Sequence, residues 1–142
     1  MKISQAPYSR LDVPACIKKV EEYTERLKNA ASAEEAGQVL VDYIADERHI
    51  ATVLSLSSIR SSQNTADEFY EAEEHYYAEA TPPLMEKLNA MYKAMLESPF
   101  RPQLEARFGN VAFINAEIAP VSYTHLWAAA PTAFTAASAS PL

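Results

Sequence analysis

The stretch from Ser32 to Arg60 reads SAEEAGQVLVDYIADERHIATVLSLSSIR, and it predicts a long amphipathic helix. Ser32 and Glu35 have the spacing of a capping box, in which the serine accepts from the amide three residues later and the glutamate reaches back. At 100° per residue one face of this helix is apolar, with Glu47 at its centre. That face consists of Ala36, Val39, Leu40, Tyr43, Glu47, Ile50 and Leu54. Its second half is apolar on several sides, which predicts a central place in a helical bundle.

Apolar residues at three- and four-residue steps predict another helix before this stretch, from about Val13 to Ala30. Asp12, two residues before Pro14, lies where a helix N-cap is expected. Cys16 lies beside the apolar face, so we expect it to be a small buried hydrophobic side chain rather than a reactive thiol.

A second capping box, Thr65-Ala66-Asp67-Glu68, predicts the start of the next helix. Its apolar face places Glu73 among aromatic side chains, and consists of Phe69, Tyr70, Glu73, Tyr76, Tyr77 and Ala80. Thr81-Pro82-Pro83 then either caps a new helix or kinks the old one, because proline lacks a backbone donor but is favourable in a first turn. The helical pattern continues to about Glu97.

The pattern changes near Pro120. A short helix from about Pro99 to Phe108 should stop at Gly109, a favourable residue for a helix C-terminus. All 12 basic and 19 acidic residues precede position 118, whereas residues 121–142 carry no charge and show no periodicity. We therefore expect an all-α fold, an antiparallel bundle of about four long helices plus a short one over residues 1–120, followed by an irregular tail.

Composition excludes several classes of protein. Half of the 142 residues are hydrophobic (49%), enough for a real core, and two glycines leave little room for the turns of an all-β fold. A net charge of −7 with no basic stripe argues against nucleic-acid binding. No apolar run approaches the ~20 residues of a membrane span, and the N-terminus lacks the apolar region of a signal peptide. With a single cysteine, these features favour a soluble protein in a reducing compartment.

The residues of known catalytic motifs are missing from the chain. His49, His75 and His125 include no pair at the i, i+4 spacing of a His-Glu-x-x-His zinc motif. Asp46-x-x-His49 is the nearest approach to a di-metal carboxylate pair, but it lies away from Glu47 and the apolar face. Two glycines cannot form a glycine-rich phosphate loop. We therefore assign no catalytic and no metal-binding residue.

Glu73 needs a partner, because an ionised carboxylate in an aromatic face is costly to bury alone. If consecutive helices are antiparallel about positions 63 and 32, Glu73 lies level with Val53, and Val53 with Leu11. We predict that Glu73 accepts from Arg10, or otherwise from the hydroxyl of Tyr8, so that the N-terminal segment is fastened to the third helix.

Two further polar pairs follow from the same matching of levels. Arg60 and Asp67 flank the connection between two antiparallel helices, so we expect them to approach one another and fix the turn. Glu47 lies level with Lys18 and could use it as a partner.

Residues 59–73, IRSSQNTADEFYEAE, followed by Pro82-Pro83, resemble the N-terminal region of the M3 metallopeptidases of the oligoendopeptidase F type. Residues 8–12, YSRLD, are similar to the opening Tyr-x-Arg-Pro-Asp of that family, with Leu11 where proline is usual. Residues 98–109 resemble its next segment through Ser-Pro-Phe-Arg, Leu-Glu and glycine. The resemblance therefore covers about residues 8–119.

The resemblance implies a cytoplasmic, zinc-dependent oligopeptidase, an all-α protein of several hundred residues that encloses a channel for short peptides. In that family two histidines and a glutamate hold zinc, and another glutamate acts as general base. No position in this chain matches those residues. The resemblance thus implies an N-terminal fragment that forms scaffold and channel wall, lacks the catalytic region and is inactive alone.

Residues 121–142 suggest a break in the gene. Val121-Ser122-Tyr123-Thr124-His125-Leu126 resembles what a transposon-end sequencing adapter encodes, so we expect a non-native tail that packs poorly; the alternative is a genuine Ala/Ser/Thr tail. A second hypothesis for the whole chain is a free-standing acidic bundle that binds a peptide or protein through Tyr70, Tyr76 and Tyr77.

Overall fold

Helices dominate the part of the chain that the computed structural model describes, residues 5–118. The elements are α1 (Val13–Lys28), α2 (Ala33–Gln63), α3 (Glu68–Glu97), α4 (Arg101–Phe108) and a further helical segment over residues 111–118. No strand occurs within residues 5–118, and the expected all-α bundle is confirmed. No helix in this range is long and apolar enough to cross a membrane. The expected tail, residues 121–142, lies outside the described residues.

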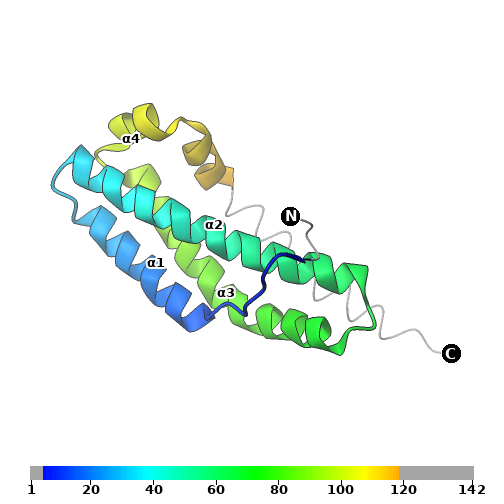
Figure 1. The fold of residues 1–142 in the computed structure, drawn as a ribbon. Coiled ribbons are helices and arrows are strands. Elements are labelled where there is room, and N and C mark those ends of the chain that lie inside the picture. Colours follow the sequence, from blue (N-terminus) through cyan, green and yellow to red (C-terminus); the bar gives the residue numbers. More distant parts are fainter. Residues whose placement is uncertain (1–4, 119–142) are drawn as a thin grey trace.

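Two long antiparallel helices, α2 and α3, form the frame of the bundle (Figure 1). Helix α1 packs against both of them, but it is only about half as long and leaves the far end of the α2–α3 hairpin uncovered. Residues 5–12, which we call the N-terminal arm, run along that uncovered half (Figure 1). Helix α4 and residues 111–118 lie at the opposite end, beside the start of α2 and the end of α3.

The first two helices begin at the caps that the sequence predicts. The Asp12 side chain accepts from the amide of Ala15 at 3.1 Å. The Ser32 side chain accepts from the Glu35 amide at 3.1 Å, and Glu35 in turn accepts from the amide of Ala31 at 2.9 Å. These contacts satisfy amides that have no partner within the helix.

The start of α3 corrects one prediction. Thr65 is exposed and lies before the helix, and the cap is Asp67, whose side chain accepts from the Phe69 amide at 3.0 Å. Thr65 and Glu68 therefore do not form a capping box. Both Asp67 and Thr65 can cap a helix, so sequence alone could not separate them.

A single helix, α3, spans both segments on either side of Pro82 and Pro83. Prolines at these positions deprive the carbonyls of Ala78 and Glu79 of their helical donors. Both residues are exposed, so water can satisfy these carbonyls. Just before the prolines, the buried Thr81 hydroxyl donates to the carbonyl of Tyr77 at 2.5 Å.

The core lies between the first three helices and contains most of the apolar faces that the sequence defined. It includes Val13, Val20 and Leu27 of α1, Ala36, Val39, Leu40 and Tyr43 of α2, and Leu84, Leu88 and Met91 of α3. Cys16 is half-buried at the edge of this core, and burial raises the pKa of its thiol. The structure thus agrees with a packing role for this cysteine.

Helix α4 approaches α2 closely at Gly37. A Cβ atom at this position would lie 2.3 Å from Nη1 and 3.3 Å from Cζ of Arg107. The missing side chain therefore allows Arg107 to lie against α2. The chain then leaves α4 through Gly109, whose φ of +82° is a conformation that other residues rarely adopt.

Candidate functional site

Glu73 is a buried charged residue with only 1% of its surface exposed. It lies in the half of the α2–α3 hairpin that α1 leaves uncovered. It lies on α3 and receives two side chains from the N-terminal arm. The hydroxyl of Tyr8 donates to Glu73 Oε2, and Nε of Arg10 donates to Oε1 at 2.8 Å. The structure therefore brings together Glu73, Arg10 and Tyr8, the three side chains that the sequence placed at one level.

Two tyrosines of α3 hold the backbone of the arm next to this carboxylate. The hydroxyl of Tyr77 accepts from the Leu11 amide at 2.9 Å and lies 2.9 Å from the Tyr8 hydroxyl. The hydroxyl of Tyr76 donates to the Leu11 carbonyl at 3.2 Å. The Arg10 guanidinium lies 4.4 Å from the centre of the Tyr76 ring, within the range of a cation–π contact.

The charge state of this cluster follows from its contacts. The hydrogen bond from Arg10 lowers the pKa of Glu73, although burial opposes that shift. Burial and the bond to Glu73 raise the pKa of Tyr8. Glu73 is therefore an ionised carboxylate at neutral pH that is closed off from solvent, which suits an anchor for the arm and not an acid or base acting on a substrate.

Arg60 and Asp67 lie in separate interactions instead of pairing with each other. Arg60 donates to the Tyr70 hydroxyl at 2.9 Å and also to the carbonyl of Ala6 in the N-terminal arm. Asp67 caps α3 through the Phe69 amide. Arg60, near the end of α2, thus adds a further attachment point for the arm.

Glu47 does not use Lys18, which is exposed on α1. The hydroxyl of Tyr92 on α3 donates to Glu47 Oε1 instead. The reason is orientation: Glu47 turns toward α3, whereas the preceding residue, Asp46, faces α1 and accepts from Tyr23 at 2.6 Å and from Lys19 at 3.0 Å. Counting residues along two antiparallel helices predicts the position of a side chain along the helix axis. It does not predict which neighbouring helix that side chain faces.

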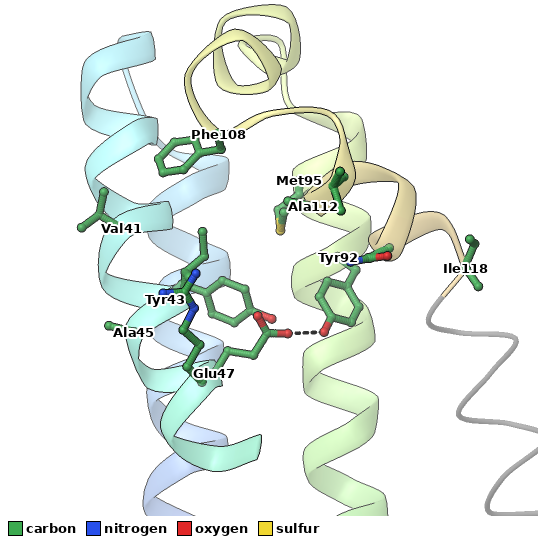
Figure 2. Close-up of a pocket in the computed structure, with 13 residues that line it drawn as sticks. Val41, Tyr43, Ala45, Glu47, Tyr92, Met95, Phe108, Ala112 and Ile118 are labelled. Carbon is green, nitrogen blue, oxygen red and sulfur yellow. Dashed lines mark hydrogen bonds between the residues drawn. The ribbon is translucent and has the colours of Figure 1, made fainter. Parts of the chain in front are cut away.

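A cavity of about 950 Å³ opens at the other end of the bundle, between α2, the end of α3 and residues 108–118 (Figure 2). We call it the apolar groove; it is lined by Val41, Tyr43, Ile44, Ala45, Glu47, Arg48, Tyr92, Met95, Phe108, Val111, Ala112, Asn115 and Ile118. Three of its apolar residues are exposed: Val41 to 40%, Val111 to 63% and Ile118 to 53%.

Polar atoms gather at the floor of the apolar groove. Figure 2 shows Tyr43 and Glu47 pointing from α2 toward Tyr92 on α3. The Tyr43 hydroxyl is buried beside Tyr92 and Glu47, both of which contribute hydrogen bonding to its electrostatics. Burial, together with the nearby Tyr92 and Glu47, raises the pKa of Tyr43 far above its ordinary value.

Sequence reasoning missed the apolar groove because it depends on the path of the chain after Gly109. Two signals were present in the sequence. Val41 is an apolar residue outside the main face of its helix, and Val111, Ile114 and Ile118 recur at helical spacing after the short fourth helix.

Within residues 5–118, no three His, Cys, Asp or Glu side chains come together in a group that could hold a metal ion. His49 and His75 are both exposed. His125 lies outside the described residues. The described side chains therefore do not fit a zinc site.

The family match and the similar solved structures point to the same family. Residues 3–121 match the family described as the peptidase M3 N-terminal domain. PZ peptidase A, solved with an inhibitor, is 28% identical with a TM-score of 0.75, covering 82% of this chain and 21% of that one. A candidate oligoendopeptidase F solved at 3.1 Å is 31% identical, with the same TM-score and coverage.

A candidate oligoendopeptidase F from Bacillus anthracis strain Ames is also 31% identical, with a TM-score of 0.74, covering 80% of this chain and 21% of that one. No curated protein matches the chain. The chain spans about a fifth of the length of each of these three structures (21%).

Proposed function

This chain belongs to the peptidase M3 family through its N-terminal domain, and on that basis we propose that it is the N-terminal region of a zinc-dependent oligopeptidase. In this role residues 1–120 provide scaffold and channel wall, and residues 121–142 are a non-native tail. The observation that carries the proposal is the match of residues 3–121 to that domain, supported by the shared fold at 31% identity.

Catalysis would be supplied by the part of the longer enzyme that this chain does not span. The related structures are about five times as long as the region they share with this chain. Because residues 5–118 contain no group of side chains suited to a metal, zinc in the parent enzyme would be held by residues elsewhere. The proposed substrates are short peptides in the cytoplasm, and the chain alone should have no peptidase activity.

The structure weakens the alternative of a peptide-binding module that uses Tyr70, Tyr76 and Tyr77. Tyr77 is 5% exposed and binds the backbone of the N-terminal arm, as does Tyr76. Tyr70 accepts from Arg60. These hydroxyl groups serve internal contacts, so this face offers a partner few free hydrogen-bonding groups.

Recovering the uninterrupted gene tests the proposal most directly. The expected result is a reading frame that continues past residue 120 and encodes a His-Glu-x-x-His motif. The recovered protein should retain zinc and cleave a fluorogenic oligopeptide, whereas the 142-residue chain with added zinc should not. A continuation of several hundred codons without that motif would refute the proposal.

A further inference from the structure

We propose that Glu73 and Tyr76 form a guanidinium-binding site, which Arg10 of the N-terminal arm fills as a removable internal ligand. The arginine side chain of a separate peptide can take the place of Arg10. The ligand class is an extended peptide that carries tyrosine and, two residues later, arginine, as the arm does at Tyr8 and Arg10. Such a site adds a binding activity to the scaffold role proposed above.

The enclosure of the Arg10 guanidinium is the first argument. One edge of the guanidinium faces the Glu73 carboxylate, where Nε donates to Oε1 at 2.8 Å and Nη2 donates to the same oxygen. Its flat face lies over the Tyr76 ring, with Cζ 4.4 Å from the ring centre. A planar guanidinium can present two donors to a carboxylate and a flat face to a ring at the same time, whereas the ammonium of lysine cannot. The geometry therefore selects an arginine side chain.

The exposure of the two charged partners is the second argument. Half of the Arg10 side chain is in solvent, whereas the Glu73 side chain is 1% exposed. The cation is thus the solvent-facing member of the pair, and a ligand that arrives from solvent meets the position of Arg10 first. A carboxylate left in this position without a cation is strongly destabilising, so the emptied site favours another guanidinium that fits.

The small apolar attachment of the arm is the third argument. Among residues 5–12 only Leu11 is buried, and Gln5, Pro7, Ser9 and Arg10 are exposed. A segment that buries little apolar surface opens at a lower free energy than well-packed helices do. The arm can therefore leave the α2–α3 hairpin while the helices stay packed.

The other contacts of the arm do not depend on its being part of the same chain. The hydroxyl of Tyr8 donates to Oε2 of Glu73, the second oxygen of the carboxylate. The hydroxyls of Tyr77 and Tyr76 bind the amide and the carbonyl of Leu11, which are backbone groups that any extended peptide offers. These contacts are internal while the arm is docked, and a peptide with tyrosine and arginine two positions apart can reproduce them.

Refilling of the emptied site tests the assignment. The full-length Arg10→Ala variant is titrated with N-acetyl-arginine amide, and N-acetyl-lysine amide is the matched probe of equal charge. A ligand at about four times its dissociation constant should raise the Tm of a chain of this size by about 3 °C. We expect that shift with the arginine probe and less than about a third of it with the lysine probe at the same concentration.

The matched control combines Arg10→Ala with Glu73→Gln, which removes the anion, and its Tm should not respond to the arginine probe. No shift in Arg10→Ala, or equal shifts for the two probes or for the two variants, would overturn the site. If Arg10→Ala does not fold, Arg10→Lys replaces it, because its ammonium keeps a cation beside Glu73 but fits the site less well. The arginine probe should raise the Tm of Arg10→Lys as well, and no shift there would also overturn the site.

A second binding measurement tests the ligand class. A fluorescent peptide with the sequence of residues 5–12 is titrated with the full-length variant that carries Tyr8→Ala and Arg10→Ala, and its anisotropy is followed. In the matched control peptide the serine and the tyrosine exchange places, so that tyrosine directly precedes arginine. The first peptide should bind at least about tenfold more tightly, because the control loses a hydrogen bond to a charged group. Equal binding of the two peptides, or no binding of the first, would overturn the ligand class.

Discussion

Arg10 and Glu73 lie 63 positions apart in the chain, and Nε of Arg10 donates to Oε1 of Glu73 at 2.8 Å. Half of the Arg10 side chain is exposed, whereas Glu73 is 1% exposed. The pair therefore joins a solvated cation on the N-terminal arm to a buried anion on α3. It holds the arm over the part of the hairpin that α1 does not reach.

Replacing Glu73 with alanine should be among the most damaging single substitutions. The change removes the acceptor for Arg10 and Tyr8, and hydrogen bonds to a charged group are worth about 1.5–3 kcal/mol each. We expect a loss of about 3 kcal/mol in the free energy of unfolding, measured by urea denaturation. The matched control is exposed Glu74→Ala, which should change stability by at most about 0.5 kcal/mol.

A double-mutant cycle tests whether the Arg10 effect acts through Glu73. Arg10→Ala should destabilise the unmodified chain and have little further effect in the Glu73→Ala background. Equal effects in both backgrounds would contradict the pairing.

The stability that Glu73 contributes should disappear in acid. Arg10 lowers the pKa of Glu73 below its ordinary value of 4.5. The contribution is therefore complete above pH 4.5 and is lost as the pH falls through the folded-state pKa. Unfolding free energies of the unmodified chain and Glu73→Gln should differ at neutral pH and converge in acid. A constant difference across that range would contradict the prediction.

The stability that the Tyr8 hydroxyl contributes should be lost at high pH, in contrast to that of Glu73. Burial raises its pKa above the ordinary value of 10.0, so its contribution is complete below pH 10.0 and is lost as the pH rises through the folded-state value. The unmodified chain should therefore lose stability above pH 10.0 more steeply than Tyr8→Phe, as followed by circular dichroism. Parallel pH profiles would show that the Tyr8 hydroxyl is not shielded.

Gly37→Ala should have an effect that depends on Arg107. Alanine in a helix interior is more favourable than glycine by about 0.5–1 kcal/mol, but its Cβ would meet the Arg107 guanidinium. We expect the full gain in the Arg107→Ala background and a smaller gain, or none, in the unmodified chain. Thermal unfolding of the four chains measures both values. The same gain in both backgrounds would show that Arg107 simply moves away.

Arg60 should be coupled to Tyr70 and not to Asp67. Asp67→Ala should cost about 1 kcal/mol through loss of the helix cap. Its effect should add to that of Arg60→Ala within about 0.5 kcal/mol. Arg60→Ala and Tyr70→Phe should be non-additive, because the two side chains share a hydrogen bond. Urea denaturation of both cycles would show coupling to Asp67 if the two residues did form a pair.

Most of the fold could be predicted because the long helices carry their own local signals, whereas the helical segment over residues 111–118 was not predicted. Asp12 and Ser32 are capping residues directly before apolar periodicity, and the structure uses both. The short connections made the helices antiparallel, so counting residues along them placed Arg10 at the level of Glu73. Local signals failed where two solutions were equally favourable, as for Thr65 and Asp67 at the start of α3.

The apolar groove could not be predicted in the same way. Its walls depend on how the chain turns at Gly109 and on the direction that Glu47 takes around the α2 axis. Neither follows from periodicity, because the apolar face of α2 borders both α1 and α3. Position along a helix can be counted from the sequence, whereas the direction of a side chain between two neighbours depends on packing.

The N-terminal arm is synthesised first but can dock only late. At about 5–20 residues per second, a ribosome needs roughly 3–13 s to add the 63 residues that separate Arg10 from Glu73. Until Glu73 has been added, the nascent arm lacks the acceptor for Arg10 and Tyr8, and its contact with Arg60 also requires the end of α2. Chaperones and proteases at the ribosome therefore meet this segment before its own hairpin does.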